Sequence, residues 1–552
     1  MASDEKGFYR EISSILKSKN TSKDELAKLK LVLSKKYNLK QTPTDIQILL
    51  HTNVKIKTKP TRTGAGVAVV ALMTRPFPCP HGKCIMCPGG PESILGNVPQ
   101  SYTGKEPATM RGLRNNFDSY LQVFNRLEQY IVMGHAPEKA EIIIMGGTFP
   151  SFPKEYQEEF IMYAFKAMND FSDLFYKKNV FDIDKFKKFF ELPGPVGDPA
   201  REKSIHEKLL KMKGKSNLEH EQRKNENSSI RCVGLTIETR PDYGKLEHAN
   251  ELLRLGATRV EVGVQSVYDD VLKKIHRGHS VEDTRESFRV LKDLGFKINA
   301  HYMPGLPGAD RKKDLDGMKA LFYDPYFRPD MLKIYPCMVI KGTKLYTLWK
   351  KGKYKPLTTK QAAKIIAKFK ATIPEYVRIM RVQRDIPTYM TSAGVDRTNL
   401  RQYVMEYMKK HNMKCRCMRC REAWNIEMKN PIIHVHEYEA SKGKEFFISV
   451  EEKDKVFGFC RLRFPSIHLR KEITKDSALV RELHVYGEAA PLGQKGVVQH
   501  QGLGTKLLEK AEQIARHNKF KKMVIISGIG VRNYYRKHGY EKEGPYMVKK
   551  LA

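Results

Sequence analysis

Between residues 67 and 346, short apolar runs alternate with stretches that have the periodicity of amphipathic helices. This alternation is expected for parallel strands joined by helices, because two parallel strands need a crossover connection between them. Six such runs predict a partial (β/α)6 barrel rather than a full eight-stranded one. The runs span residues 66–73, 140–145, 232–237, 259–264, 297–302 and 332–335.

The rest of the chain falls into segments around this barrel. With 552 residues, three to four domains are expected. We expect a basic helical arm in residues 1–62, the partial barrel in 63–346, a basic linker in 347–430 and a separate α/β domain in 431–552. Residues 171–229 are rich in lysine and show little apolar periodicity, which predicts an insertion in the barrel segment.

The charge of the chain points to a polyanionic partner. Lys and Arg exceed Asp and Glu by 99 − 62 = 37, and the surplus is spread over nearly the whole sequence. Nucleic acid is the leading candidate and an anionic membrane surface is the alternative, although no apolar run approaches the ~20 residues that span a bilayer. The first residues lack the apolar core of a signal peptide, so a cytoplasmic protein is expected.

Three cysteines, Cys79, Cys84 and Cys87, stand in a C-x4-C-x2-C pattern within a turn rich in Pro and Gly. Clustered cysteines, nine in all, favour metal binding over a disulfide framework. Three thiolates can hold a [4Fe–4S] cluster that keeps one iron open. They can equally form part of a zinc site that is completed by His81 or a distant cysteine. The spacing alone leaves both possibilities open.

Polar or glycine-rich motifs follow four of the predicted strands, where β/α barrels place their chemistry. They begin at Met145, Glu238, Glu261 and His301. Glycines at a strand end let the backbone approach a ligand closely. We therefore expect a cofactor at this edge of the barrel, with cofactor-binding residues Gly146, Gly147, Glu238 and Gln265.

The cysteine loop and these strand ends together resemble the radical S-adenosylmethionine superfamily. This resemblance implies a [4Fe–4S] cluster on Cys79, Cys84 and Cys87, with S-adenosylmethionine on its open iron. The first cysteine gap is four residues here, whereas three is more usual. Longer motifs, among them PCPHGKCIMCPGGP, IMGGTFPSFP, TIETRPDY and RELHVYGEAAP, resemble the catalytic subunit of Elongator, and the likeness runs from about residue 55 to the end.

The last segment shows the pattern of a GNAT-type acetyltransferase. Gln499-His500-Gln501-Gly502-Leu503-Gly504 fits the Q-x-x-G-x-G signature, in which free amides at a helix N-terminus bind the pyrophosphate of coenzyme A. A strand at 480–485 precedes it and a helix at 505–517 follows. The expected acetyl-CoA contacts are Glu482, Leu483, His484, Val485, Gln499, Gln501, Gly502, Leu503, Gly504 and Thr505.

Tyr534 and Tyr535 open the next helix and are positioned to meet the thioester. Packing on a helix face is the alternative for one of them, and the resemblance makes Tyr535 the functional one. The resemblance also implies that Lys139 contacts acetyl-CoA. We further expect Lys333 and Tyr335, on the last predicted strand, to point into the radical site. Of the 17 histidines, His301 and His484 stand out as site candidates.

A second cysteine cluster, Cys415, Cys417 and Cys420, lies in the linker. A tetrahedral zinc ion needs a fourth ligand. Cys337 is the expected one and His411 is the second choice. We expect this zinc site to be structural.

The resemblance implies one reaction that uses both halves of the chain. S-adenosylmethionine would yield a 5′-deoxyadenosyl radical that takes hydrogen from the acetyl methyl group. The resulting carbon would add to C5 of the wobble uridine of tRNA, U34, and thioester hydrolysis would leave 5-carboxymethyluridine. A base in the anticodon stem-loop can be exposed in this way because single-stranded loops present unstacked bases.

Two other functions remain as alternatives. A protein or histone lysine acetyltransferase would use only the last segment, with Glu482 or His484 as its base. A scaffold that binds tRNA without catalysis would not cleave S-adenosylmethionine. For the tRNA-modifying enzyme, either a self-sufficient single subunit or a homodimer is expected.

Overall fold

The fold is given by a computed structural model that describes residues 4–18, 21–52, 66–194, 197–423, 426–487 and 502–551. The chain divides into two compact units. Unit 1 comprises Met1–Val70, Tyr120–Ala140 and Met162–Arg231, and unit 2 comprises Ala71–Ser119, Glu141–Ile161 and Cys232–Ala552. None of the described helices is long and apolar enough to cross a membrane.

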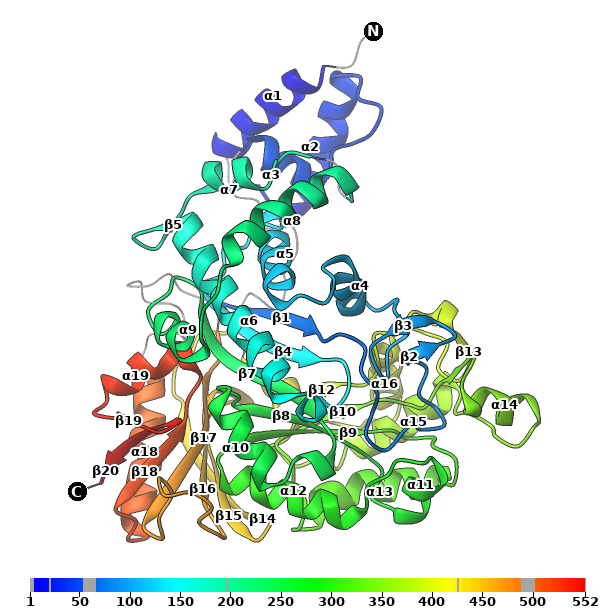
Figure 1. The fold of residues 1–552 in the computed structure, drawn as a ribbon, viewed down its shortest axis with the longest axis vertical. Helices are drawn as coiled ribbons and strands as arrows, with labels where there is room; N and C mark the ends of the chain where they lie inside the picture. The colour runs from blue at the N-terminus through cyan, green and yellow to red at the C-terminus, as the bar shows by residue number, and fades with distance from the viewer. Residues whose placement is uncertain are drawn as a thin grey trace. The chain divides into compact units, whose positions relative to one another are not determined.

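Unit 1 begins with the expected helical arm (Figure 1). Ser22 and Glu25 form a reciprocal cap at the start of the second helix, since each side chain accepts the other's backbone N–H. Phe8, Ile12 and Ile48 are buried between the helices. A small apolar core therefore holds the arm together beneath its basic surface. The helices are α1 (Glu5–Ser18), α2 (Lys23–Lys36) and α3 (Asp45–Thr52).

The described part of residues 171–229, expected to be an insertion, is largely helical and has a core of its own. Phe171, Phe175, Phe186 and Phe190 are fully buried and contact one another. Polar residues, with lysines from residue 177 onward, separate these phenylalanines in the sequence, which explains why no apolar run marks them. The neighbouring elements are α5 (Ser119–Val132), α6 (Lys154–Phe175), β5 (Tyr176–Lys177), β6 (Val180–Phe181), α7 (Ile183–Phe189), α8 (Pro199–Lys213) and α9 (Leu218–Asn225).

The barrel segment forms a seven-stranded half-barrel in the order β1-β4-β7-β8-β9-β10-β12. Each of the six predicted runs is one of its strands, and the printed pairings from β7 to β12 are parallel. The seventh strand, β12, escaped prediction because only Ile379 of its four residues is buried. The strands are β1 (Val67–Met73), β4 (Lys139–Met145), β7 (Arg231–Thr239), β8 (Arg259–Gln265), β9 (Lys297–Tyr302), β10 (Met331–Ile334) and β12 (Arg378–Arg381).

Helices connect these strands, and α12 packs against β9. Ser280 caps α12 and Asp310 caps α13 through side-chain oxygens that accept backbone N–H groups. The elements of this region and the linker are β2 (Gly90–Ser93), β3 (Gly96–Val98), α4 (Pro107–Arg114), α10 (Leu246–Arg254), α11 (Asp269–Lys274), α12 (Val281–Asp293), α13 (Arg311–Tyr323), β11 (Val339–Ile340), α14 (Lys344–Lys350), α15 (Thr359–Lys370), β13 (Thr391–Ala393), α16 (Leu400–Lys410) and α17 (Met418–Arg421).

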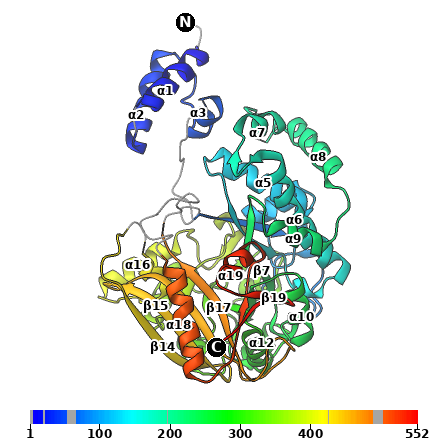
Figure 2. The ribbon, with the colours of Figure 1, turned by 90° about the vertical axis from the view of Figure 1, so that its left-hand side faces the viewer.

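The last segment forms a second seven-stranded sheet in the order β14-β15-β16-β17-β18-β20-β19. Helix α18 packs across β15, β16 and β17 (Figure 2). The parallel pair β17–β18 is joined only over Ser477 to Val480, so the strands part beyond this point. The elements are β14 (Ile432–Ala440), β15 (Gly443–Glu452), β16 (Lys455–Phe464), β17 (Ser477–Val485), α18 (Leu503–His517), β18 (Lys522–Ile526), α19 (Arg532–Arg536), β19 (Glu541–Glu543) and β20 (Tyr546–Lys550).

Within unit 2, the half-barrel and the second sheet share a buried ionic network. Arg481 of β17 binds Asp330 (Nη2 to Oδ1, 2.5 Å), which precedes β10, and also Glu445 of β15 (2.9 Å). Arg463 of β16 binds Asp293 at the end of α12 (2.6 Å). All five side chains are fully buried. Since a buried charge that loses its partner is strongly destabilising, this network fixes one sheet against the other.

Candidate active site

The first three cysteines lie in the loop that follows β1. Cys84 and Cys87 are buried and Cys79 is half-buried. The three sulfurs do not all lie within 4.8 Å of one another. One zinc ion needs ligands that close, whereas a four-iron cluster can take each thiolate on a different iron. The wider spacing therefore favours the iron–sulfur cluster.

Hydrogen-bond donors surround these sulfurs. Gln100 Nε2 lies 3.0 Å from Cys87 Sγ, and Arg277 Nη1 lies 3.8 Å from Cys84 Sγ. Burial raises the pKa of Cys79 to about 11 and also raises the pKa of Cys84. The thiolate form therefore depends on a nearby positive charge, which a bound metal supplies. This donor set fits the ligands of a [4Fe–4S] cluster.

The strand ends beside this loop carry buried polar atoms that have no hydrogen-bond partner among the described residues. Gly146 and Gly147 adopt φ values of +127° and +124°, and a Cβ atom on Gly146 would come within 2.1 Å of Thr74 Oγ1. Thr74 Oγ1, Arg240 Nη1 and Gln265 Oε1 are buried and have no hydrogen-bond partner in the part of the chain that the structure describes. Buried polar atoms normally have partners, so these fit a polar cofactor such as S-adenosylmethionine.

Four adjacent strands bring Glu238, Glu261, His301 and Lys333 together inside the half-barrel, and we call these four residues the barrel cluster. Glu238 pairs with Glu261 in the register of β7 and β8, and His301 pairs with Lys333 in that of β9 and β10. His301 Nε2 lies 2.9 Å from Glu261 Oε2, and the Lys333 ammonium binds the same oxygen. Ligand atoms of Glu238, Glu261 and His301 lie within 4.8 Å of one another.

Within the barrel cluster, Glu261 and Lys333 hold each other in their charged forms. Burial alone would raise the pKa of Glu261, but Lys333 and His301 bring it well below its ordinary value. Burial opposes the charge of Lys333, yet Glu261 raises its pKa on balance. The predicted pair Lys333 and Tyr335 thus lies at the cluster, with the Tyr335 ring 5.3 Å from that of His301.

Sequence reasoning selected Glu238 and Lys333 but did not assign Glu261 a role. The signal was present, since Glu261 stands between Val260 and Val262 in a strand that is buried on both faces. A carboxylate there needs a partner. Tyr102, from the loop after the cysteines, was also missed, and its hydroxyl donates to Glu238 Oε2 (3.1 Å).

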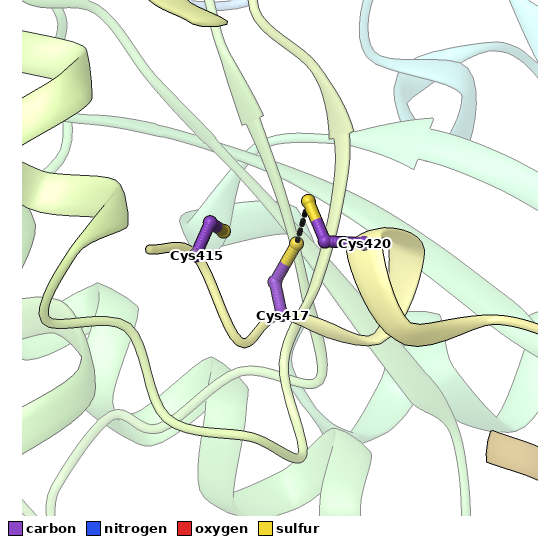
Figure 3. A group of neighbouring side chains, drawn as sticks. All are labelled: Cys415, Cys417 and Cys420. Carbon is purple, nitrogen blue, oxygen red and sulfur yellow. Dashed lines mark hydrogen bonds between the residues drawn. The ribbon is translucent and has the colours of Figure 1, made fainter. Parts of the chain in front are cut away.

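The second cysteine group assembles as expected in part (Figure 3). The sulfurs of Cys415, Cys417 and Cys420 lie within 4.8 Å of one another, and Cys417 is 3.7 Å from Cys420. Two ligands of a tetrahedral zinc with bonds of about 2.3 Å are roughly 3.8 Å apart, so this spacing fits. The structure does not bring Cys337 to the group. Cys337 is buried with Ile85, Val271 and other apolar residues.

On the acetyltransferase side, β17 and α18 present the expected acetyl-CoA residues that the structure describes. Leu483 and Val485 pack against the core of the sheet, beyond the point where β17 leaves β18. Gly502 precedes α18 with a φ of +76°, which frees the first amides of the helix, beginning with Leu503, Gly504 and Thr505. Gln499 and Gln501 lie outside the described residues.

Glu482 and His484 are half-buried and engaged with side chains of β16. Glu482 accepts from Arg461 Nε (2.9 Å). Burial would raise its pKa, but Lys297 and Arg461 lower it. Burial lowers the pKa of His484 to about 4, and its ring stacks on Phe459. Neither side chain is placed as an exposed general base.

The two tyrosines of α19 differ in their surroundings. Tyr535 is 6% exposed and belongs to the core of the sheet, whereas Tyr534 is 36% exposed. A Cβ atom on Gly504 would come within 2.7 Å of the Tyr534 hydroxyl, so that hydroxyl lies against the start of α18. Lys139 begins β4 and belongs to unit 1, where burial lowers its pKa.

Comparisons with known families agree with this arrangement. The radical SAM superfamily matches residues 78–316, the Radical_SAM C-terminal domain matches 329–410, and the acetyltransferase (GNAT) family matches 405–540. The half-barrel and the second sheet thus correspond to two families joined in one chain.

Similar proteins extend over nearly the whole chain. The tRNA uridine(34) acetyltransferase of Methanocaldococcus jannaschii is 47% identical over 90% of this chain and 86% of its own length. Elongator complex protein 3 of Saccharomyces cerevisiae is 41% identical over 98% of this chain and 94% of its own. The solved structure of archaeal Elp3 from Methanocaldococcus infernus, which has an N-terminal deletion, aligns with a TM-score of 0.72 at 40% identity, covering 88% of this chain and all of that one.

Proposed function

The chain belongs to the family of the catalytic Elongator subunit and the archaeal tRNA uridine(34) acetyltransferases, and we propose that it converts the wobble uridine of tRNA to 5-carboxymethyluridine. One observation carries this proposal. A cysteine loop suited to a [4Fe–4S] cluster and a GNAT-type helix start lie in the same compact unit, joined by the buried ionic network. A reaction that used only the cluster site or only the acetyl-CoA site would not explain why both are present in one chain.

Residues of the half-barrel hold the cofactors in this proposal. Cys79, Cys84 and Cys87 bind the cluster, and Gly146, Gly147 and Gln265 contact S-adenosylmethionine. When bound, this pair supplies hydrogen-atom abstraction. The proposal is supported by the unpaired Gln265 Oε1 and by the donors that point at the cysteine sulfurs.

Acetyl-CoA binds along β17 and at the start of α18 in this proposal. The main chain of Leu483 to Val485 pairs with the pantetheine arm, and the free amides at the start of α18 hold the pyrophosphate. Tyr535 donates to the thioester carbonyl. Burial raises the pKa of Tyr535, which keeps its hydroxyl protonated and able to donate. Lys139 is an additional acetyl-CoA contact that follows from the family alone.

The anticodon stem-loop is the proposed RNA substrate region, and the surplus of 37 basic residues supports binding to its phosphates. A single self-sufficient subunit is the simplest assembly, since both sites lie in one chain. Structural zinc is proposed on Cys415, Cys417 and Cys420. Its fourth ligand is not Cys337 in the observed arrangement, and His411, whose Nδ1 lies 2.9 Å from the Tyr407 carbonyl, remains the second choice.

The lysine acetyltransferase alternative gains no support. Its candidate bases were Glu482 and His484. Both are half-buried and engaged with β16: Glu482 binds Arg461, and the His484 ring stacks on Phe459. An acceptor lysine would need an exposed base beside the thioester.

An anaerobic assay tests the proposed function. Reconstituted protein is given a reductant, S-adenosylmethionine, acetyl-CoA and bulk tRNA, and nucleosides are read by mass spectrometry. We expect 5-carboxymethyluridine from the wild type and none from Cys84→Ala/Cys87→Ala, which cannot hold the cluster. Cys232→Ala, which removes a buried thiol of β7 away from the loop, is the matched control and should retain the product.

The two halves can be separated in the same assay. Tyr535→Phe should lose most of the product while S-adenosylmethionine cleavage persists, because only the thioester contact is removed. If the reconstituted wild type makes no modified uridine but transfers acetyl groups to protein lysines, the proposed function is wrong.

A further inference from the structure

We propose that the barrel cluster recognises the uracil base itself, with Lys333 donating to O4 and Glu238 accepting from N3–H. This inference rests on the proposed function and adds the residues that distinguish uracil from cytosine. Glu238 was expected to bind the cofactor, and this inference gives it a substrate contact in its place because it pairs with Glu261 in the register of β7 and β8.

The position of the cluster supports this role. Its four residues come from four adjacent strands, so their side chains meet on the inner side of the half-barrel. Glu238, His301 and Lys333 each stand one residue before the carboxyl end of their strands, whereas Glu261 lies four residues before the end of β8. Glu238 and the two nitrogen-bearing side chains therefore line the side toward the strand ends, where the cysteine loop lies, and Glu261 lies deeper.

The free hydrogen-bonding groups match one base. The Lys333 ammonium has three donors, and Glu261 is its one hydrogen-bond partner among the described residues. Glu238 uses one oxygen for the Tyr102 hydroxyl and keeps acceptor capacity on the other. Uracil offers an acceptor at O4 beside a donor at N3, whereas cytosine offers a donor at N4 beside an acceptor at N3. A cation next to a carboxylate therefore suits uracil and opposes cytosine.

A metal ion fits the same group less well. Glu238, Glu261 and His301 are close enough to share an ion. However, the Lys333 ammonium already binds Glu261 Oε2, the oxygen that also faces His301. A divalent cation there would meet a fixed positive charge. Glu261 is thus a positioning residue, which holds Lys333 and His301 in place.

A binding experiment tests this inference without requiring turnover. Reconstituted full-length protein with S-adenosylmethionine is titrated with two fluorescent anticodon stem-loop RNAs that differ only in U or C at position 34. We expect wild type to prefer the U34 RNA by about tenfold, within the range of one base-specific hydrogen-bond pair. Glu238→Gln should reduce this preference to about twofold or less, because an amide can turn to donate or to accept.

Matched variants separate recognition from folding. Glu247→Gln makes the same change on a side chain that is 81% exposed and should keep the wild-type preference. The double variant Lys333→Met/Glu261→Gln removes the O4 donor without leaving an unpaired buried charge, and it should lose the preference while binding the C34 RNA as wild type does.

The outcomes are distinct. A wild type without preference, or a Glu238→Gln variant that keeps it, overturns the inference. If Glu238→Gln no longer binds either RNA, the double variant provides the test: keeping the U34 preference overturns the inference, and losing it supports the inference. A U34 preference that these variants abolish, in a protein that makes no modified uridine, would keep the recognition and reject the proposed function.

Discussion

At the scale of single residues, the two neighbouring tyrosines of α19 show that identical side chains next to each other in sequence can differ in burial. Tyr535 lies in the core of the second sheet, and Tyr534 lies at its surface against the start of α18. The proposed function gives the thioester contact to Tyr535, so its hydroxyl and its ring are separately testable. The ring packs in the core, and the hydroxyl carries the proposed chemistry.

We predict different costs for two substitutions of Tyr535. Tyr535→Phe keeps the ring, so the free energy of unfolding should change by less than about 1 kcal/mol while acetyl-CoA hydrolysis falls at least about tenfold. Tyr535→Ala should also destabilise the protein by about 3–5 kcal/mol, because it leaves a cavity in the core. Denaturant titration and a thiol-release assay measure the two effects. Unchanged hydrolysis in Tyr535→Phe would show that the hydroxyl has no role.

Single residues also show what the sequence could reveal about the site. The cysteines, the strand-end glycines and Lys333 carry signals that do not depend on distant parts of the chain. Glu261 carries a signal too, but its partners His301 and Lys333 are 40 and 72 residues away, and only the register of the strands brings them together. Cys337, the expected fourth ligand of the proposed zinc site, is a similar case, because it packs with residues remote in sequence.

At the scale of elements, the turn after β9 depends on a buried carboxylate. Asp314, in the first turn of α13, accepts the Gly305 backbone N–H (2.8 Å) and is 1% exposed. Burial raises its pKa to about 7. Gly305 has a φ of +83°, a conformation that suits glycine, and the bond holds the turn in this conformation.

This shift predicts a pH dependence. The native pKa of Asp314 lies above its ordinary value of 3.8, so the protonated carboxyl stabilises the fold at low pH and that contribution is lost as the pH rises toward 7. Asp314→Asn does not titrate. Its stability relative to wild type should therefore be more favourable at pH 8 than at pH 5, by on the order of 2 kcal/mol. Denaturant titration at both pH values tests this, and an equal difference at both would contradict the shift.

Elements were predictable where their pattern is local. All six predicted runs became strands, and Val, Ile and Leu are frequent in most of them, although residues 297–302 contain only one of these. Helix α18 was recognisable from its glycines and its apolar face. Strand β12 was not, because only Ile379 of its four residues is buried and Arg378 meets its ion-pair partner Glu422 only in the folded chain. The phenylalanine core at residues 171–190 was hidden by the polar residues between its members.

At the scale of the whole molecule, the buried ionic network decides whether the two catalytic halves behave as one body. Arg481 and Glu445 of the second sheet and Asp330 beside the half-barrel are fully buried, and Arg481 binds both carboxylates. Asp330 also accepts the backbone N–H of Ile298 (2.8 Å). Charged groups so far from water are stable only while they remain paired. The halves of unit 2 are therefore expected to unfold together.

Arg481→Met tests this coupling. The variant leaves Asp330 and Glu445 without their main cation, so we expect it to be destabilised by about 3–5 kcal/mol and to replace one calorimetric transition of unit 2 with two. Adding Asp330→Asn should recover part of the loss, because the amide oxygen can still accept from Ile298 without carrying a charge. Arg223→Met, at a side chain that is 74% exposed, is the surface control and should shift the transition by less than about 1 kcal/mol. A single transition in Arg481→Met, with the stability of the wild type, would mean that apolar contacts alone join the two halves.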